Sequence, residues 1–128
     1  KGMQVGRHEI LLRPKWVKMV NECLSSRGQT PLYVALRFGL NNNNFQMLDI
    51  LLKNINDVNR PNRDGSTPLI GLCYGPDGDA SIDFMYVANM INRLCSIGAN
   101  LNLANDRGEF PLTILHTKSI SGLLQFKL

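Results

Sequence analysis

The sequence has few of the residues from which redox, metal and cofactor sites are built. It contains three cysteines and two histidines among 128 residues. No two cysteines form a C-x-x-C pair, so neither a zinc site nor a thioredoxin-like dithiol is supported. Cys23, Cys73 and Cys95 each lie in an apolar run, and we expect buried free thiols, which are typical of a reducing compartment. We therefore predict an intracellular protein, either cytoplasmic or nuclear.

Long apolar runs and targeting segments are also missing. No stretch approaches the roughly 18 consecutive apolar residues of a membrane span, so we expect no membrane partner. The first residues carry charges at Lys1, Arg7 and Arg13 and do not resemble a signal peptide. Hydrophobic residues make up 44% and charged residues 19% of the chain, which is typical of a globular domain. Because the chain begins with Lys rather than Met, we expect a module of a larger protein.

Charge of one sign is scarce outside the N-terminal region. Residues 1–27 carry six basic and two acidic residues, whereas the rest of the chain carries eight of each. Proteins that bind a phosphate backbone usually show a basic stripe along their main surface. The terminal position of the excess disfavours nucleic acid as the partner. It leaves a contact through the basic N-terminal region as a minor alternative.

The usual motifs of catalysis are missing as well. His8 and His116 have no carboxylate or nucleophile at a motif spacing, and the sequence has no phosphate loop, Gly-x-Ser-x-Gly elbow or His-Glu-x-x-His. Residues 77–83 place oxygen side chains at alternate positions, as a calcium loop does, but Ile82 stands where that loop needs glycine. We predict no enzyme activity, no cofactor and no metal site, and interpret 77–83 as a solvated loop.

What the sequence does contain is a repeated turn. Residues 28–32, 65–69 and 108–112 each begin with Gly and end with Pro-Leu, with their third positions 37 and 43 residues apart. In the first two, a Thr before the Pro is a good helix N-cap, and Pro fits the first helical position. The Gly allows a turn with positive φ. Each segment therefore predicts a turn followed by a short helix.

The turns are embedded in longer matching units. Residues 57–65 correspond to 100–108, and apolar runs with helical spacing precede them at 47–52 and 85–94. Each unit is predicted to contain a turn, a short inner helix, a loop, an outer helix and an extended crossing to the next turn. The extra residues that lengthen two units fall between inner and outer helix, at 41–44 and about 75–83. One pair of helices cannot bury both faces, so neighbouring units must stack.

These units resemble ankyrin repeats, whose period is ~33 residues and whose motif is Thr-Pro-Leu-His-x-Ala. The resemblance implies an all-α fold, an ankyrin-repeat solenoid of stacked helix-turn-helix units joined by hairpin-like turns. It covers residues 28–118. The motif His is replaced by Tyr33, Ile70 and Thr113, and Phe110 replaces a capping Thr. We therefore expect a less regular or less stable array.

The two ends complete the predicted organisation. Residues 1–27 form an extended lead-in and a helix over 14–25, which is a cap or a degenerate repeat. Trp16, Val17, Val20 and Leu24 lie on one stripe of that helix. Residues 119–128 are predicted to form a separate C-terminal helix that closes the last repeat.

The resemblance implies a non-catalytic module that binds a protein partner on a concave face, formed by turn tips and inner helices. The tip residues carried over from the family pattern are Arg27, Gln29, Asn62, Arg63, Ser66, Asp106, Arg107 and Glu109. From the inner helices come Arg37, Phe38, Tyr74 and Lys118. The three tip arginines are expected to form a ladder along one edge, near the two aromatic rings.

Arginine and aromatic residues are enriched at interface hot spots. We therefore expect a monomeric module that binds a segment of acidic and apolar character. One alternative is a structural spacer that docks on neighbouring domains of its own chain, through the apolar last segment with Ile120, Leu123 and Phe126.

Overall fold

The computed structural model describes residues 13–22, 24–38, 45–75 and 84–127, with the backbone alone at 45 and 120–127. The described part is helical and contains no strand. Its elements are α2 (Pro14–Glu22), α3 (Pro31–Arg37), α4 (Phe45–Asn54), α5 (Pro68–Tyr74), α6 (Phe84–Ser96) and α7 (Pro111–Lys127). The predicted all-α fold is confirmed.

The short helices α3 and α5 begin where the repeated motif predicts. Thr30 caps α3 by accepting a hydrogen bond from the Tyr33 N–H at 3.1 Å, and Thr67 caps α5 in the same way through the Ile70 N–H at 3.3 Å. A proline occupies the first turn of each helix, where its missing N–H costs nothing. Local capping chemistry therefore fixes both helix starts.

The third inner helix, α7, begins with a different cap. Phe110 stands at the capping position, and its N–H donates to the Thr113 hydroxyl at 2.8 Å. This is half of a capping box, in which the third helical residue reaches back to the cap backbone. The Thr113 hydroxyl therefore satisfies the N–H of residue 110, a different group from the one that a capping Thr satisfies in α3 and α5.

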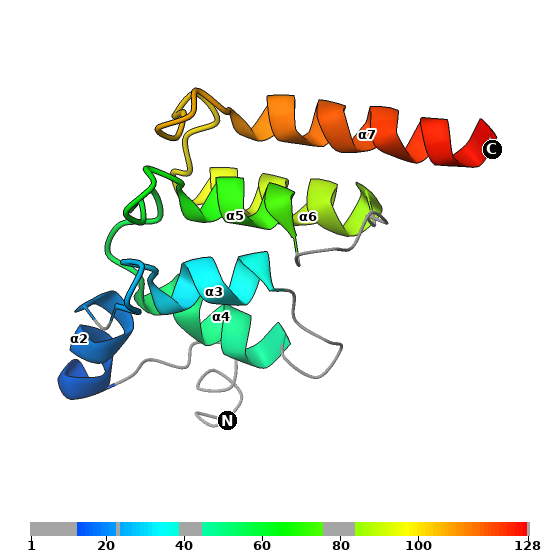
Figure 1. Ribbon diagram of the computed structural model, residues 1–128. Helices are drawn as coiled ribbons and strands as arrows, with labels where there is room; N and C mark the ends of the chain where they lie inside the picture. Colours follow the sequence, from blue (N-terminus) through cyan, green and yellow to red (C-terminus); the bar gives the residue numbers. More distant parts are fainter. Residues whose placement is uncertain (1–12, 23, 39–44, 76–83, 128) are drawn as a thin grey trace, which may run out of the picture.

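The helices form a two-layer stack (Figure 1). Helices α3, α5 and α7 lie side by side, α4 packs against α3, and α6 packs against α5. Leu32, Leu48, Leu69 and Leu94 are 0–1% exposed and come from four different helices. The core therefore joins inner and outer layers, as a stacked array of helix pairs requires.

Tyr33 occupies the position of the motif histidine and is buried against the neighbouring unit. It is 1% exposed, and a Cβ added at Gly71 would lie 2.8 Å from its Cε2. The ring fits because residue 71 of α5 has no side chain. The replacement of His by Tyr in one unit is therefore matched by glycine in the next.

Helix α2 ends at Glu22, three residues before the predicted end. It packs against α3 and α4, which is the position of an outer helix in a preceding unit. Val20 packs on the core, whereas Trp16 is 48% exposed, so the predicted stripe is only partly buried.

The buried Asn21 amide bridges to the next unit: it donates to the Asn54 carbonyl at 2.9 Å and accepts from the Asn56 N–H at 2.7 Å.

The third unit differs from the prediction. Residues 111–127 form one continuous helix, so no separate helix begins at residue 119. The first two units have a polar or glycine-rich stretch after the inner helix, which interrupts it. Residues 112–121 contain neither glycine nor proline, so the helix continues. In the described part of the chain, α7 has no outer helix of its own unit beside it.

None of the described helices combines the length and apolar character that crossing a membrane requires. The two predicted insertions, at 41–44 and about 75–83, lie almost wholly outside the described residues, as do residues 1–12.

Candidate partner-binding face

Each turn tip is built around one side-chain oxygen, three residues before the turn glycine. This oxygen accepts hydrogen bonds from two backbone N–H groups of the tip, at 2.9–3.2 Å. The residues that supply it are Ser25, Asn62 and Asn105. Ser25 and Asn105 were not among the residues predicted from the sequence. The signal that could have found them is the Ser or Asn at the same distance from Gly28, Gly65 and Gly108.

Neighbouring tips are joined in a constant register. The Arg63 N–H donates to the Arg27 carbonyl at 3.1 Å, and the Asp106 N–H donates to the Asp64 carbonyl at 2.8 Å. In both pairs the donor lies two residues before its turn glycine, and the acceptor lies one residue before. Three turns with positive φ at the glycine therefore form one hydrogen-bonded edge.

Within this register, the three arginines of the predicted ladder do not all occupy the same position. Arg27 and Arg107 occupy equivalent positions, but the middle turn has Asp64 there and carries Arg63 one residue earlier. At the position directly before the turn glycine the residues are therefore Arg27, Asp64 and Arg107.

Arg37 joins the two inner helices on the predicted face. Its guanidinium lies over the Phe38 ring at 5.3 Å and over the Tyr74 ring at 5.1 Å, within cation–π range of both. Its Nε donates to the Gly75 carbonyl at 3.3 Å. Phe38 is 47% exposed, so an apolar ring with a cation beside it faces solvent.

Tyr74 also connects this cluster to the third turn tip. Its hydroxyl donates to the Glu109 carboxylate, and accepts from Asn105 Nδ2 at 2.8 Å and from Arg107 Nη2 at 3.2 Å. Burial, followed by the hydrogen bond to Glu109, raises the pKa of Tyr74. The hydrogen bonds from Asn105 and Tyr74 hold the pKa of Glu109 below its ordinary value. Glu109 is therefore a fixed anion rather than a mobile tip charge.

Most of the predicted interface residues lie together in the structure, but some of them are buried or hydrogen-bonded within the chain. Ser66 is 1% exposed and accepts from the Asn105 amide at 3.2 Å, so it is not available to a partner. The Asn62 side chain holds its own turn, and the Lys118 ammonium donates to the Tyr74 carbonyl. Arg27, Arg63, Asp106 and Arg107 are exposed, and Gln29 is half-buried.

The family model for the ankyrin repeat matches residues 27–63, less than a third of the chain. This segment spans the first turn, α3, α4 and the crossing to the second turn. Residues 27–63 form an ankyrin repeat. No curated protein sequence matches the chain. Ankyrin repeats are generally protein-interaction modules, and the family is typically non-enzymatic.

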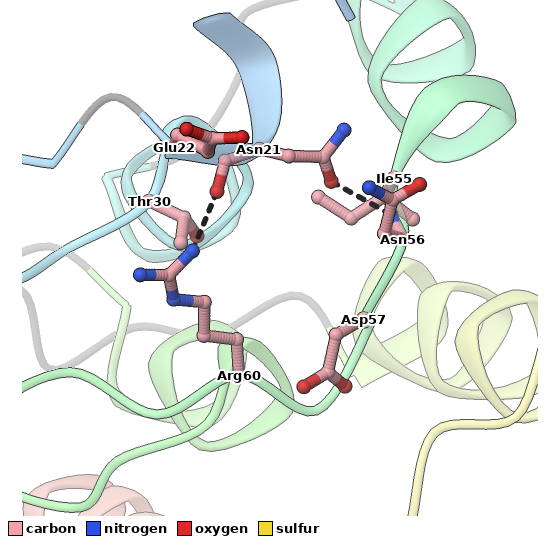
Figure 2. A pocket seen from close by; sticks show the side chains of 7 residues that line it. All are labelled: Asn21, Glu22, Thr30, Ile55, Asn56, Asp57 and Arg60. Carbon is pink, nitrogen blue, oxygen red and sulfur yellow. Dashed lines mark hydrogen bonds between the residues drawn. The ribbon is translucent and has the colours of Figure 1, made fainter. Parts of the chain in front are cut away.

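A small hollow lies where the ankyrin repeat meets α2, with a volume of about 130 Å³. Figure 2 shows its lining, which includes Asn21, Thr30 and Arg60. Arg60 Nη1 donates to the Asn21 carbonyl at 2.6 Å, and Thr30 caps α3. These polar groups are committed to one another and to the backbone. The hollow therefore lies along a seam between units, where Asn21, Thr30 and Arg60 already form hydrogen bonds.

The candidate catalytic and metal-ligating side chains of the helical array are few in the described part of the chain. His116 is exposed on α7, and within the described ranges no three His, Cys, Asp or Glu side chains converge as metal ligands would. Cys73 is fully buried, which raises the pKa of its thiol to about 12; Cys95 is half-buried. His8, Cys23 and the 77–83 segment lie outside the described residues.

Proposed function

We propose that this chain binds a protein segment on the face formed by its turn tips and inner helices, with Arg37, Phe38 and Tyr74 at the centre. The observation that carries the proposal is the exposed Phe38 ring, held beside the Arg37 cation and the Tyr74 ring of the neighbouring unit. Arginine and aromatic side chains held in a fixed geometry are the usual anchors of an interface.

The proposed ligand is a segment with an apolar side chain next to a carboxylate. The positive charge of this face comes from the inner helices, at Arg37 and Lys118, because the turn tips carry three basic and three acidic residues. The apolar side chain packs on Phe38, and the carboxylate lies near Arg37 and Arg107. Association of this kind is steered by charge but depends for affinity on the buried ring.

A random peptide library displayed on phage tests the proposal. Peptides enriched on the wild-type chain are measured again against Phe38→Ser, Arg107→Glu and a matched control, Met85→Lys. Met85 is 72% exposed on the outer helix α6, so the control adds a charge away from the proposed face. We expect enriched peptides with paired apolar and acidic residues. Their affinity should fall at least tenfold on Phe38→Ser and should be unchanged by Met85→Lys. Peptides that bind all three variants as they bind the wild type would refute the proposal.

The two alternatives from the sequence have less support in the described residues. The spacer alternative depends on Ile120, Leu123 and Phe126, whose side chains lie outside the described part. For the nucleic-acid alternative, Lys15 and Lys18 are exposed on α2, but Lys15 lies over the Trp16 ring at 5.9 Å. Both remain predictions, and an affinity that falls steeply with salt would distinguish the second.

A further inference from the structure

The described part of the stack ends on an incomplete unit at α7. Leu32, Leu69 and Leu112 follow the Pro of the three equivalent turns, and the first two are 0% and 1% exposed, whereas Leu112 is 64% exposed. The outer helices α4 and α6 accompany α3 and α5, but of the described helices only α5 packs on α7. Half of a repeat is present here: a turn and an inner helix with an uncovered apolar flank.

The third turn is uncovered in the same direction. A Cβ added at Gly28 would lie 3.1 Å from Arg63, and one at Gly65 would lie 2.6 Å from Asp106, because each turn is covered by the next. At Gly108 a Cβ would meet no described atom within 4 Å. The position at which a further turn would be joined is therefore open to solvent on the described surface.

The opposite end of the stack has the complementary half. Helix α2 packs on α3 and α4 as an outer helix, with no inner helix of its own unit among the described elements. Its Trp16 and Met19 are 48% and 46% exposed. They lie one helical turn apart, which places them on one stripe. Helices α2 and α7 lie at opposite ends of the stack (Figure 1).

We propose that two copies of this chain join head to tail, with α2 of one copy as the missing outer helix of α7 in the other. The apolar stripe of α2 then covers Leu112. The first turn of the second copy continues the edge of tips, and its Ser26 N–H, equivalent to the Arg63 N–H, donates to the Arg107 carbonyl. The contact repeats the register that already joins the three turns within the chain.

The geometry favours a second copy because one chain supplies both halves of the missing unit, facing outward at its two ends. Such a contact is heterologous, so each copy retains one free half and the assembly grows into chains unless the rotation closes it. This differs from the monomer expected from the sequence. It does not rest on the proposed peptide site: the Phe38 and Arg37 side chains take no part, and Arg107 contributes its backbone carbonyl rather than its side chain.

Sedimentation velocity over a range of concentrations tests the proposal with two blocking variants. Leu112→Glu blocks the α7 half and Met19→Glu blocks the α2 half. Leu112 is 64% and Met19 46% exposed, so both variants should fold, and circular dichroism checks this. Met85→Glu on α6 serves as the matched control. We expect wild type and control to associate with rising concentration, and each blocked variant to remain at 14.3 kDa.

The mixture of the two blocked variants gives the decisive result. One variant keeps an intact α7 half and the other an intact α2 half, so the mixture should form a dimer of twice 14.3 kDa and nothing larger. A wild-type chain that is monomeric at every concentration overturns the proposal. This is also the result expected if the open ends bind a different occupant. Dimers that form in Met19→Glu alone also overturn it, because they would show pairing of α7 with α7.

Discussion

Asn105 makes more interactions than any other tip residue described, and it connects three parts of the face. Its Oδ1 accepts from the Arg107 and Glu109 N–H groups, and its Nδ2 lies within hydrogen-bond distance of Ser66, Tyr74 and Glu109. A single 6% exposed amide thereby holds the third turn and orients the Glu109 carboxylate. The predicted interface residues are therefore positioned by one that the sequence analysis did not single out.

The fixed charge of Glu109 predicts a pH-dependent contribution to stability. The pKa of Glu109 is lowered in the folded chain from its ordinary value of 4.5. The stabilisation is therefore fully present above about pH 5 and is lost as the pH falls through the lower folded pKa. Glu109→Gln keeps an acceptor oxygen but removes the charge. The free energy of unfolding should differ between wild type and Glu109→Gln at pH 7, and the difference should be smaller at pH 3. Urea titrations at both pH values measure it; a difference independent of pH would contradict this account.

Between helices, the contact of Tyr33 with Gly71 shows how one unit depends on the next. The ring of α3 occupies the space that a side chain on α5 would take. Because the ring is 1% exposed, it has little room to move. A glycine inside a helix ordinarily costs stability, so its presence here is explained by the packing of the neighbouring unit.

Gly71→Ala therefore sets two effects of opposite sign against each other. Helix propensity alone predicts a gain of about 1 kcal/mol, whereas overpacking of a buried contact costs ~1–3 kcal/mol. With the added Cβ 2.8 Å from the ring, we expect net destabilisation, measured by urea unfolding.

The double variant Tyr33→Leu/Gly71→Ala provides the control for this prediction. With the ring removed, adding Ala at 71 should be neutral or stabilising relative to Tyr33→Leu alone. Destabilisation of equal size in both backgrounds would show that the ring is not the cause.

The elements could be predicted from the sequence where their causes are local. Thr30 and Thr67 cap their helices, and the turn glycines adopt positive φ, because these features depend on residues within one turn. The match of Tyr33 with Gly71 depends on stacking across residues far apart in the chain, which no local pattern reports. The single helix α7 was missed because the third unit was assumed to copy the first two, although residues 112–121 contain no helix breaker.

At the scale of the whole molecule, the array is held by contacts between neighbouring units. Helix α5 packs against α3, α6 and α7, whereas α2 and α7 each lie at an end. Stability in stacked repeats is a sum of such neighbour terms. The centre should therefore open less often than the ends.

Amide hydrogen exchange followed by mass spectrometry measures this gradient. At concentrations where the chain is monomeric, amides of α5 should exchange most slowly, and those of α2 faster, because its exposed face has no described helix against it. Uniform protection across the chain would indicate one cooperative core instead of a stack of units.

Along the edge of hydrogen-bonded tips, the junction between two turns does not depend on the number of residues between them. Equivalent turns lie 37 and 43 residues apart, yet both junctions show the same donor and acceptor positions. In the sequence, the added residues fall between inner and outer helix and not at the turns that form the junctions. Evolution can therefore lengthen or replace those connections, and a designer can insert foreign segments there, while the pitch from one tip to the next is preserved.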